Sequence, residues 1–299
     1  MRLAHLSDPH IAPLPKVNGV DLLSKRITGY INWRRKRHLD HDRAVLDALV
    51  RDVHAQKPDH IVITGDLVNL ALSQEIEQAA RWLERVGTPD EVTIIPGNHD
   101  AYVPGALSRA ISAWKPYLLS DGASDVQFPV TRTRGPIHLL GLSSAIATGP
   151  FMATGRVGSY QLQRLRQALR AASSAHLVRI VMVHHPVQPD ACPSYKSLTN
   201  ADEVCALVKE EGADLILHGH THLPTHAELP GPGGPVPVLG VASASQAIAR
   251  ARPAADYNLF EINEGTERHL ITHRRRRSTH DGLAFEDVQP SKVYGAYAK

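Results

Sequence analysis

The amino-acid sequence predicts a layered α/β domain with strands inside and helices outside. Short apolar runs, the pattern of buried strands, alternate with longer segments whose apolar residues recur at helical spacing. The composition agrees, because 42% hydrophobic and 21% charged residues are typical of a globular protein. No stretch approaches the ~20 uninterrupted apolar residues that a membrane-spanning helix needs.

Buried strands are predicted at six short apolar runs, which cover residues 3–6, 60–64, 92–96, 137–143, 179–183 and 214–217. Helices are predicted between them, where apolar residues recur every three or four positions near residues 45–53, 76–83, 162–169 and 204–208. Three later runs lack intervening helices, and we expect them to form antiparallel strands of a second sheet. These runs cover residues 236–242, 257–262 and 268–272.

One domain is expected over residues 1–273, followed by a basic extension over residues 274–299. The Pro/Gly-rich stretch 230–235 is predicted to be a loop between strands, because strand patterns continue after it. From about Arg274 the pattern fades into a polar tail. Arg274 to Arg277 form a basic run there, which we interpret as a solvated tail or a contact for an acidic partner.

The N-terminus and the two cysteines indicate a cytoplasmic protein. Asp8 and His10 interrupt the first apolar run too early for the core of a signal peptide. Cys192 and Cys205 match no disulfide or zinc spacing, so we interpret them as reduced thiols.

Polar residues that can bind metals follow five of the six predicted strands. The chain contains 18 histidines, and histidine is the commonest metal ligand in proteins. Because ligands bind beyond the carboxyl ends of strands in α/β sheets, these residues are expected to share one site. They are Asp8 and His10, then Asp66, Asn98 and His184, and finally His220 and His222.

Two divalent cations fit this set better than one. Asp8 and His10 are two residues apart in an extended segment, so their side chains point to the same side, as do those of His220 and His222. The carboxylate of Asp66 is the best candidate to bridge the two ions. Mixed carboxylate, imidazole and amide ligands suit Mn, Fe, Zn or Co. Each block alone also fits an ordinary turn or a packed histidine, but the coincidence of all five favours a metal site.

The five blocks resemble those of the calcineurin-like metallophosphoesterase superfamily, which run D-x-H, GD, GNH[DE], H and G-H-x-H. The resemblance covers residues 1 to about 225 and implies a four-layer α/β/β/α sandwich of two mixed sheets flanked by helices. It also implies two divalent metal ions. One set of ligands is then Asp8, His10, Asp66 and His222, and the other is Asp66, Asn98, His184 and His220.

The resemblance further implies a mechanism without a serine or cysteine nucleophile. A hydroxide held between the two metals attacks phosphorus. His99 matches the histidine that contacts the phosphate and can protonate the leaving alkoxide. Asn69 stands where some members have an aspartate that orients this histidine, so Asn69 and Asp100 are both candidate supports. His185 is expected either behind the metal ligands or facing the substrate.

The motif combination is similar to that of class III cyclic nucleotide phosphodiesterases and bacterial glycerophosphodiesterases. We therefore expect a phosphodiesterase that acts on a small diester, with cyclic nucleotides as the leading example. A nuclease is an alternative, although a net charge of +3 and 5% aromatic residues do not favour a nucleic-acid partner. A non-enzymatic metal-binding scaffold, like the vacuolar sorting proteins with this fold, is the other alternative. A homodimer formed through the late strands also remains open.

The segment 13–41, directly after the first block, is an insertion that contains a predicted basic helix. It is interpreted either as a cap over the active site or as an amphipathic helix on an anionic membrane. In the second case the protein is peripheral at the inner membrane surface. The substrate is then a lipid-linked phosphodiester or pyrophosphate, as in the related UDP-2,3-diacylglucosamine hydrolases. Its apolar stripe is Leu22, Leu23, Ile27, Tyr30 and Ile31, and its basic residues include Lys25, Arg26 and Arg34 to Arg37.

Overall fold

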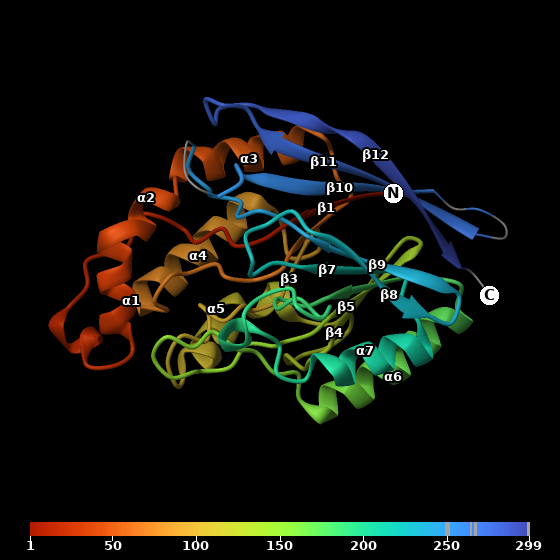
Figure 1. Cartoon of the computed structure of the whole chain (residues 1–299), viewed down its shortest axis with the longest axis horizontal. Coiled ribbons are helices and arrows are strands. Elements are labelled where there is room, and N and C mark those ends of the chain that lie inside the picture. The colour runs from red at the N-terminus through yellow and green to blue at the C-terminus, as the bar shows by residue number, and fades with distance from the viewer. Residues whose placement is uncertain (249–251, 264, 266–267, 298–299) are drawn as a thin grey trace.

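Two mixed sheets pack face to face at the centre of the computed structural model, which describes residues 1–248, 252–263, 265 and 268–297 (Figure 1). The strand order of the first sheet is β12 (Phe285–Tyr297), β11 (Arg268–Ser278), β10 (Asp256–Asn263), β1 (Arg2–Leu6), β2 (His60–Ile63) and β3 (Val92–Ile94). The strand order of the second is β4 (Val130–Arg134), β5 (Ile137–Gly141), β6 (Val178–Met182), β7 (Leu215–His218), β9 (Gly234–Gly240) and β8 (His226–Gly231).

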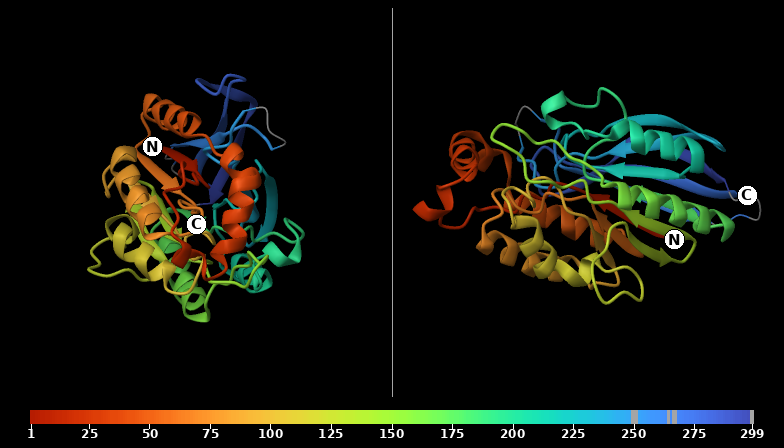
Figure 2. Two further views of the ribbon diagram at one scale, coloured as in Figure 1. Left: turned by 90° about the vertical axis from the view of Figure 1, so that its left-hand side faces the viewer. Right: turned by 90° about the horizontal axis from the view of Figure 1, so that it is seen from below.

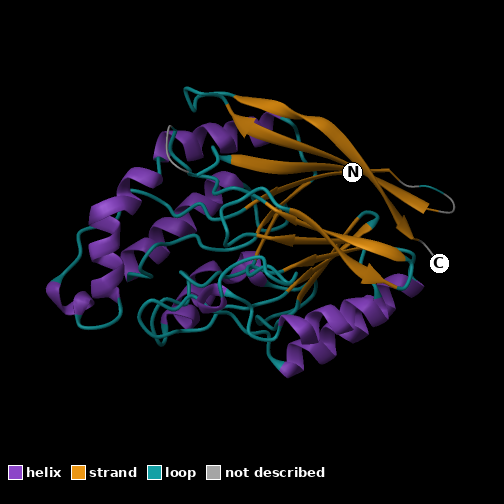
Figure 3. Ribbon diagram, viewed as in Figure 1, coloured by secondary structure: helices purple, strands orange, loops and turns teal. Residues whose placement is uncertain are grey.

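Helices cover the outer face of each sheet (Figure 3). The first sheet is covered by α3 (Arg43–Ala55), α4 (Ser73–Val86) and α5 (Ala106–Leu118). The second sheet is covered by α6 (Ser159–Ser174) and α7 (Ala201–Glu211). The predicted four-layer α/β/β/α sandwich of two mixed sheets is therefore confirmed.

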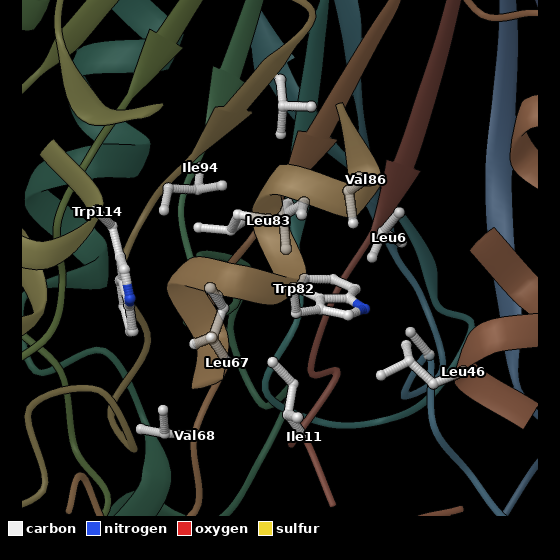
Figure 4. Packing of buried hydrophobic residues seen from close by; sticks show 14 of the residues in the cluster. Leu6, Ile11, Leu46, Leu67, Val68, Trp82, Leu83, Val86, Ile94 and Trp114 are labelled. Atoms are coloured by element: carbon white, nitrogen blue, oxygen red, sulfur yellow. The ribbon is translucent and has the colours of Figure 1, made fainter. Parts of the chain in front are cut away.

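Three apolar clusters hold these layers together. Leu46 of α3 and Trp82 and Leu83 of α4 pack on the first sheet, as Figure 4 shows for part of this cluster. A second cluster joins α6 and α7 to the second sheet. The third lies between the sheets, where Leu3 and Phe260 of the first sheet are fully buried together with residues of the second. Burial of such side chains is the main stabilising contribution of the sandwich.

Several elements were not predicted, among them β8 and β12, and the sequence signal is weak in α5 and β4. Helix α5 buries Ala106, Ala110 and Trp114, but its small residues and the internal Pro116 hide the apolar period. Strand β4 is short, and its buried Arg132 breaks the apolar pattern. The guanidinium of Arg132 donates to several backbone carbonyls of neighbouring segments, which is why a charged side chain is tolerated there.

The late strands do not form a second sheet of their own, so that prediction is wrong. β10 pairs antiparallel with β1, β11 pairs with β10, and both therefore belong to the first sheet. Only β9 joins the second sheet, where it is parallel to β7. The pairing partner of a strand can lie far away in the sequence. β1 pairs along one edge with β10, which is more than two hundred residues away, and no local pattern indicates this pairing.

The predicted polar tail is also wrong, because Arg274 to Arg277 lie inside strand β11 and residues 285–297 form β12. The domain boundary expected at residue 274 falls within a paired strand, while residues 298–299 lie outside the described part. Each arginine has a carboxylate partner within 4.0 Å on a neighbouring element. The partners are Glu261 and Asp287 for Arg274, Asp256 for Arg275, Asp52 and Asp287 for Arg276, and Glu286 for Arg277.

The inserted segment consists of four short helical pieces, and the predicted basic helix is confirmed. They are η1 (Gly19–Leu22), α1 (Arg26–Asn32), the π-helical turn η2 (Trp33–Arg37) and α2 (His38–Asp40). Figure 2 shows this segment at one end of the sandwich. Its C-terminal end is anchored by backbone hydrogen bonds between residues 40–42 and 245–247. None of the described helices is both long and apolar enough to span a bilayer.

The ion pair between Arg276 and Asp52 should contribute measurably to stability. Its two hydrogen bonds of 2.7 and 2.8 Å join side chains that are only 12% and 17% exposed. We expect Arg276→Ala to lower the free energy of unfolding by about 2–3 kcal/mol, because Asp52 loses its bidentate partner. The matched control is Arg277→Ala, whose exposed pair with Glu286 should change it by less than ~0.5 kcal/mol. Equal losses in urea unfolding of the two variants would contradict this assignment.

Candidate metal centre

The loops that follow five strands meet at one end of the sandwich. The backbone N–H groups of Asp8 and His10, after β1, each donate at 3.0 Å to the carbonyls of Gly65 and Asp66, after β2. The structure brings together all seven residues predicted as ligands, and six of them are buried, His220 being half-buried. They are Asp8, His10, Asp66, Asn98, His184, His220 and His222.

One group of ligand atoms is formed by Asp8, His10 and His222. His222 Nε2 lies 3.2 Å from Asp8 Oδ1 and 3.2 Å from His10 Nε2. His10 Nδ1 lies 3.0 Å from the carbonyl of Val68. Because a carbonyl only accepts, Nδ1 carries the proton and Nε2 is left with a free lone pair, the form that binds a metal.

A second group is formed by Asp66, Asn98, His184 and His220. His184 Nε2 lies 3.3 Å from Asp66 Oδ2 and 3.1 Å from Asn98 Oδ1. His220 Nδ1 lies 2.8 Å from the same Asn98 oxygen. His184 Nδ1 donates at 2.6 Å to the carbonyl of Thr64, so its Nε2 also faces the group. Burial opposes a charge on His184, but the Asp66 carboxylate prevails and raises its pKa to about 9.

Asp66 lies between the two groups. Its Oδ2 is 3.7 Å from His10 Nε2 in the first and 3.3 Å from His184 Nε2 in the second. Asp8 Oδ1, a buried atom of the first group, has no hydrogen-bond partner. In the second group His184 Nε2 and His220 Nδ1 converge on Asn98 Oδ1. Converging carboxylate, amide and imidazole atoms fit divalent cations, which satisfy lone pairs that would otherwise be buried at a cost.

The backbone of this site is strained. Five of the seven residues have positive φ, a region that non-glycine residues rarely adopt and that costs about 1–3 kcal/mol each. Such strain persists only where the surrounding structure imposes it, and here it turns the side chains toward a common centre. The φ angles are 53° for Asp8, 35° for His10, 57° for Asp66, 68° for His220 and 55° for His222.

Asp100 supports the site through backbone contacts rather than through His99. Its buried carboxylate accepts N–H groups of Gly97 at 2.7 Å and of Asp66 and Leu67 at 2.9 Å. It therefore joins the turn after β2 to the turn after β3. Burial, followed by the negative charge of Asp66, raises the pKa of Asp100 to about 8.

His99 is oriented by Asn69, but not by its side chain. His99 Nδ1 donates at 2.6 Å to the backbone carbonyl of Asn69, whereas the Asn69 amide nitrogen lies 3.4 Å from the Ile11 carbonyl. His99 Nε2 lies 2.9 Å from Nη1 of Arg37. Burial and then the charge of Arg37 lower the pKa of His99 to about 3, so the ring is neutral in this arrangement.

His185 lies behind the candidate ligand residues. Its Nδ1 is 2.7 Å from Ser144 Oγ, its Nε2 is 3.1 Å from the Ala153 carbonyl, and its ring centre is 4.4 Å from that of His220. Gly155 packs directly against it, since a Cβ there would lie 2.3 Å from His185 Nδ1. Of the two positions expected for His185, the structure therefore favours a packing role over contact with substrate.

A cavity of about 1000 Å³ opens over the ligand residues, and the segment 13–41 forms one of its walls. We call this segment the cap. Sequence analysis missed two of its residues as parts of the site. Arg37 Nη2 lies 3.0 Å from His10 Nε2, and the ring of His41 lies 4.6 Å from that of His10. Their position in the insertion directly after the first block was the only signal that could have indicated them.

Comparison with known proteins identifies the family. Residues 1–224 match the sequence model of the calcineurin-like phosphoesterases. The chain belongs to this family. Its members are phosphoester hydrolases that use two divalent metal ions, and the clusters of buried His and Asp in this chain fit such a pair.

Solved structures with the same fold include two phosphatases. A dimetal phosphatase from Danio rerio aligns with a TM-score of 0.61 at 12% identity, over 96% of this chain and 98% of that chain. A purple acid phosphatase from yellow lupin (Lupinus luteus) seeds also aligns with a TM-score of 0.61 at 12% identity. That alignment covers 99% of this chain but 54% of the lupin chain. No curated protein matches this calcineurin-like phosphoesterase in sequence.

Asp100 should be needed for metal binding although it is not expected to be a ligand. Asp100→Ala leaves buried N–H groups of two turns without an acceptor, so we expect metal affinity to fall by about 10–100-fold. Asp100→Asn keeps one acceptor oxygen and should lose less. His99→Ala serves as the control and should retain both ions. Titration calorimetry with Mn²⁺ measures the affinities, and unchanged binding by Asp100→Ala would contradict the proposed support.

Proposed function

We propose that this phosphoester hydrolase is a phosphodiesterase acting on a small diester, with cyclic nucleotides as the leading example. The cavity over the ligand residues carries the proposal. At about 1000 Å³ it lies at the upper end of typical ligand sites, and its lining includes residues of the cap and residues 151–153. A phosphorus atom above Asp66 would therefore have room for two ester substituents. A cytoplasmic location is part of the same proposal.

In this proposal two divalent ions, of Mn, Fe, Zn or Co, are held by the two groups of ligands that share Asp66. Bound there, they would supply a nucleophile at neutral pH and neutralise charge on the phosphate. The chain orients the ligand side chains for metal binding. The carbonyls of Val68 and Thr64 accept hydrogen bonds from Nδ1 of His10 and His184, so the Nε2 atom of each ring is directed toward the proposed ions.

Arg37 is proposed to bind the phosphate of the substrate. Its Nη2 lies 3.0 and 3.4 Å from the two ring nitrogens of His10, and its Nη1 lies 2.9 and 3.3 Å from those of His99, so the guanidinium lies over the faces of both rings. These contacts leave the in-plane lone pair of His10 Nε2 to a metal ion and give the guanidinium N–H groups no in-plane acceptor on either ring. A phosphate oxygen is the natural acceptor, because charge-assisted hydrogen bonds to phosphate are the ones that arginine makes best.

His99 is proposed to face the same phosphate and the leaving group. Its Nδ1 is held by the Asn69 carbonyl, so Nε2 is the atom directed toward the substrate. Arg37 and burial favour the neutral ring before substrate binds. A role as proton donor to the leaving alkoxide therefore depends on the negative charge that the substrate brings.

A second candidate is a lipid-linked phosphodiester or pyrophosphate, and the mouth of the cavity favours it. Phe151, Met152 and Ile31 line the cavity although they are 83%, 40% and 45% exposed. Such exposed apolar side chains suit an acyl or prenyl substituent. Lys196 and Arg252 line the same cavity and suit a further anionic group, as in a pyrophosphate.

Hydrolysis of model substrates tests the proposal. Metal-stripped protein should regain activity with Mn²⁺, Zn²⁺, Fe²⁺ or Co²⁺, and it should cleave bis-p-nitrophenyl phosphate with a higher kcat/KM than p-nitrophenyl phosphate. Asp66→Asn is the matched control, because it removes the negative charge of the one residue that the two groups of ligands share. Cleavage of the monoester alone would end the diester proposal and leave the metal centre standing.

Replacement of Arg37 tests its contact with phosphate. Loss of one charge-assisted hydrogen bond is worth about 1.5–3 kcal/mol, so Arg37→Ala should lower kcat/KM for the diester by about 10–100-fold. Its inhibition by inorganic phosphate should weaken in parallel, with metal content unchanged. Arg34→Ala is the control, since Arg34 is exposed on the same cap and does not line the cavity. Equal effects of the two substitutions would refute the assignment.

A further inference from the structure

The outer face of the cap carries apolar side chains that the fold does not cover. Val20 and Leu23 are 79% and 83% exposed, and Ile27 and Ile31 are 48% and 45% exposed. Ile27 and Ile31 are four residues apart and share one side of α1, whereas Val20 and Leu23 lie in and directly after η1, which residues 23–25 separate from α1. Four large aliphatic side chains that face water in one short segment are costly, and they indicate a surface that is covered in use.

The opposite side of the cap is fixed to the protein, so this orientation is not accidental. Tyr30 packs against the apolar cluster of the first sheet. A Cβ on Gly29 would lie 2.3 Å from the Tyr102 hydroxyl, which shows how closely α1 approaches the body there. Lys25 Nζ donates at 2.7 Å to Thr148 Oγ1 and at 2.9 Å to the Met152 carbonyl. The cap and the loop around residue 151 thus form one continuous rim around the cavity.

The charge of the cap is strongly positive. Residues 13–41 contain seven Lys or Arg and two Asp, a formal charge of +5, whereas the whole chain carries +3. The remainder of the protein is therefore slightly negative. Among the described residues, Arg34, Arg35 and Lys36 are exposed and have no carboxylate partner, unlike the arginines of β11.

We propose that this outer face of the cap docks on an anionic lipid bilayer. Val20, Leu23 and Ile27 would enter the boundary between headgroups and acyl chains, while Arg34 meets headgroup phosphates and Arg35 and Lys36 lie at the mouth of the cavity. Aliphatic side chains beside unpaired cations complement such a surface in both polarity and charge. Nucleic acid would instead call for stacking aromatic or polar side chains in place of the aliphatic ones. The proposal goes beyond the phosphodiesterase activity and does not depend on it.

Docking in this way would place the mouth of the cavity at the bilayer. Ile31 is one of the exposed apolar residues of the cap and also lines the cavity, as does the exposed Phe151 of the neighbouring loop. The same contact would therefore bring a phosphate carried on a lipid to the ligand residues without removing its acyl chains from the membrane.

Vesicle co-sedimentation with the full chain tests the docking surface. We expect binding to vesicles of phosphatidylcholine mixed with phosphatidylglycerol, weaker binding at high salt, and no binding to pure phosphatidylcholine. Val20→Ser/Leu23→Ser and, separately, Arg34→Glu should each lower the apparent affinity at least tenfold. Val293→Ser and Arg85→Glu are the matched controls, because they change an apolar and a basic residue that are also exposed but lie on β12 and α4.

Hydrolysis of bis-p-nitrophenyl phosphate in solution separates the two proposals. The docking variants should keep this activity and their metal content, since none of the changed residues lines the cavity. Failure of the wild-type protein to sediment with anionic vesicles at low salt overturns the inference, as does equal binding by the Val20→Ser/Leu23→Ser variant. Retention on single-stranded DNA without any vesicle binding would assign the basic face to nucleic acid and overturn it as well.

Discussion

The buried carboxylate of Asp100 is the interaction on which the metal centre depends. It accepts backbone N–H groups from the turn after β2 and from the turn after β3, so these two turns are held at a fixed separation. Asp66 lies in the first turn and Asn98 in the second. Their side chains can therefore face the histidines of both groups although no hydrogen bond joins the two residues. Burying this carboxylate removes it from water, which disfavours its charged form. The raised pKa of Asp100 reflects this cost.

The two sheets supply the rigidity that a strained site needs. The turns of Asp8, Asp66 and His220 have left-handed backbone, which is unfavourable unless the flanking segments leave no alternative. The strands before these turns are almost completely buried between the sheets and the helices. Strain at the site is thus balanced by packing in the sandwich, and the site can be organised before any ion or substrate binds.

Two basic runs of similar composition have different surroundings. In β11 every second arginine faces the same side, and the register with β10 and β12 brings a carboxylate beside each of them. In the cap the residues from Arg34 to Lys36 project from a helical turn at the end of the sandwich, where no carboxylate partners them among the described residues. A run of basic residues therefore indicates a partner only when the fold leaves its charges uncompensated.

By itself the sequence determined the α/β class, the five blocks at strand ends and the set of candidate ligand residues, because ligand chemistry and strand patterns are local. Only the tertiary structure decided that β10 and β11 extend the first sheet, since strand partners are chosen across the chain. It also decided that the backbone carbonyl of Asn69, and not its side chain, accepts the hydrogen bond from His99, and that Arg37 of the cap contacts the ring of His10. These contacts depend on backbone direction and on segments brought together from far apart, which no residue type in the sequence specifies.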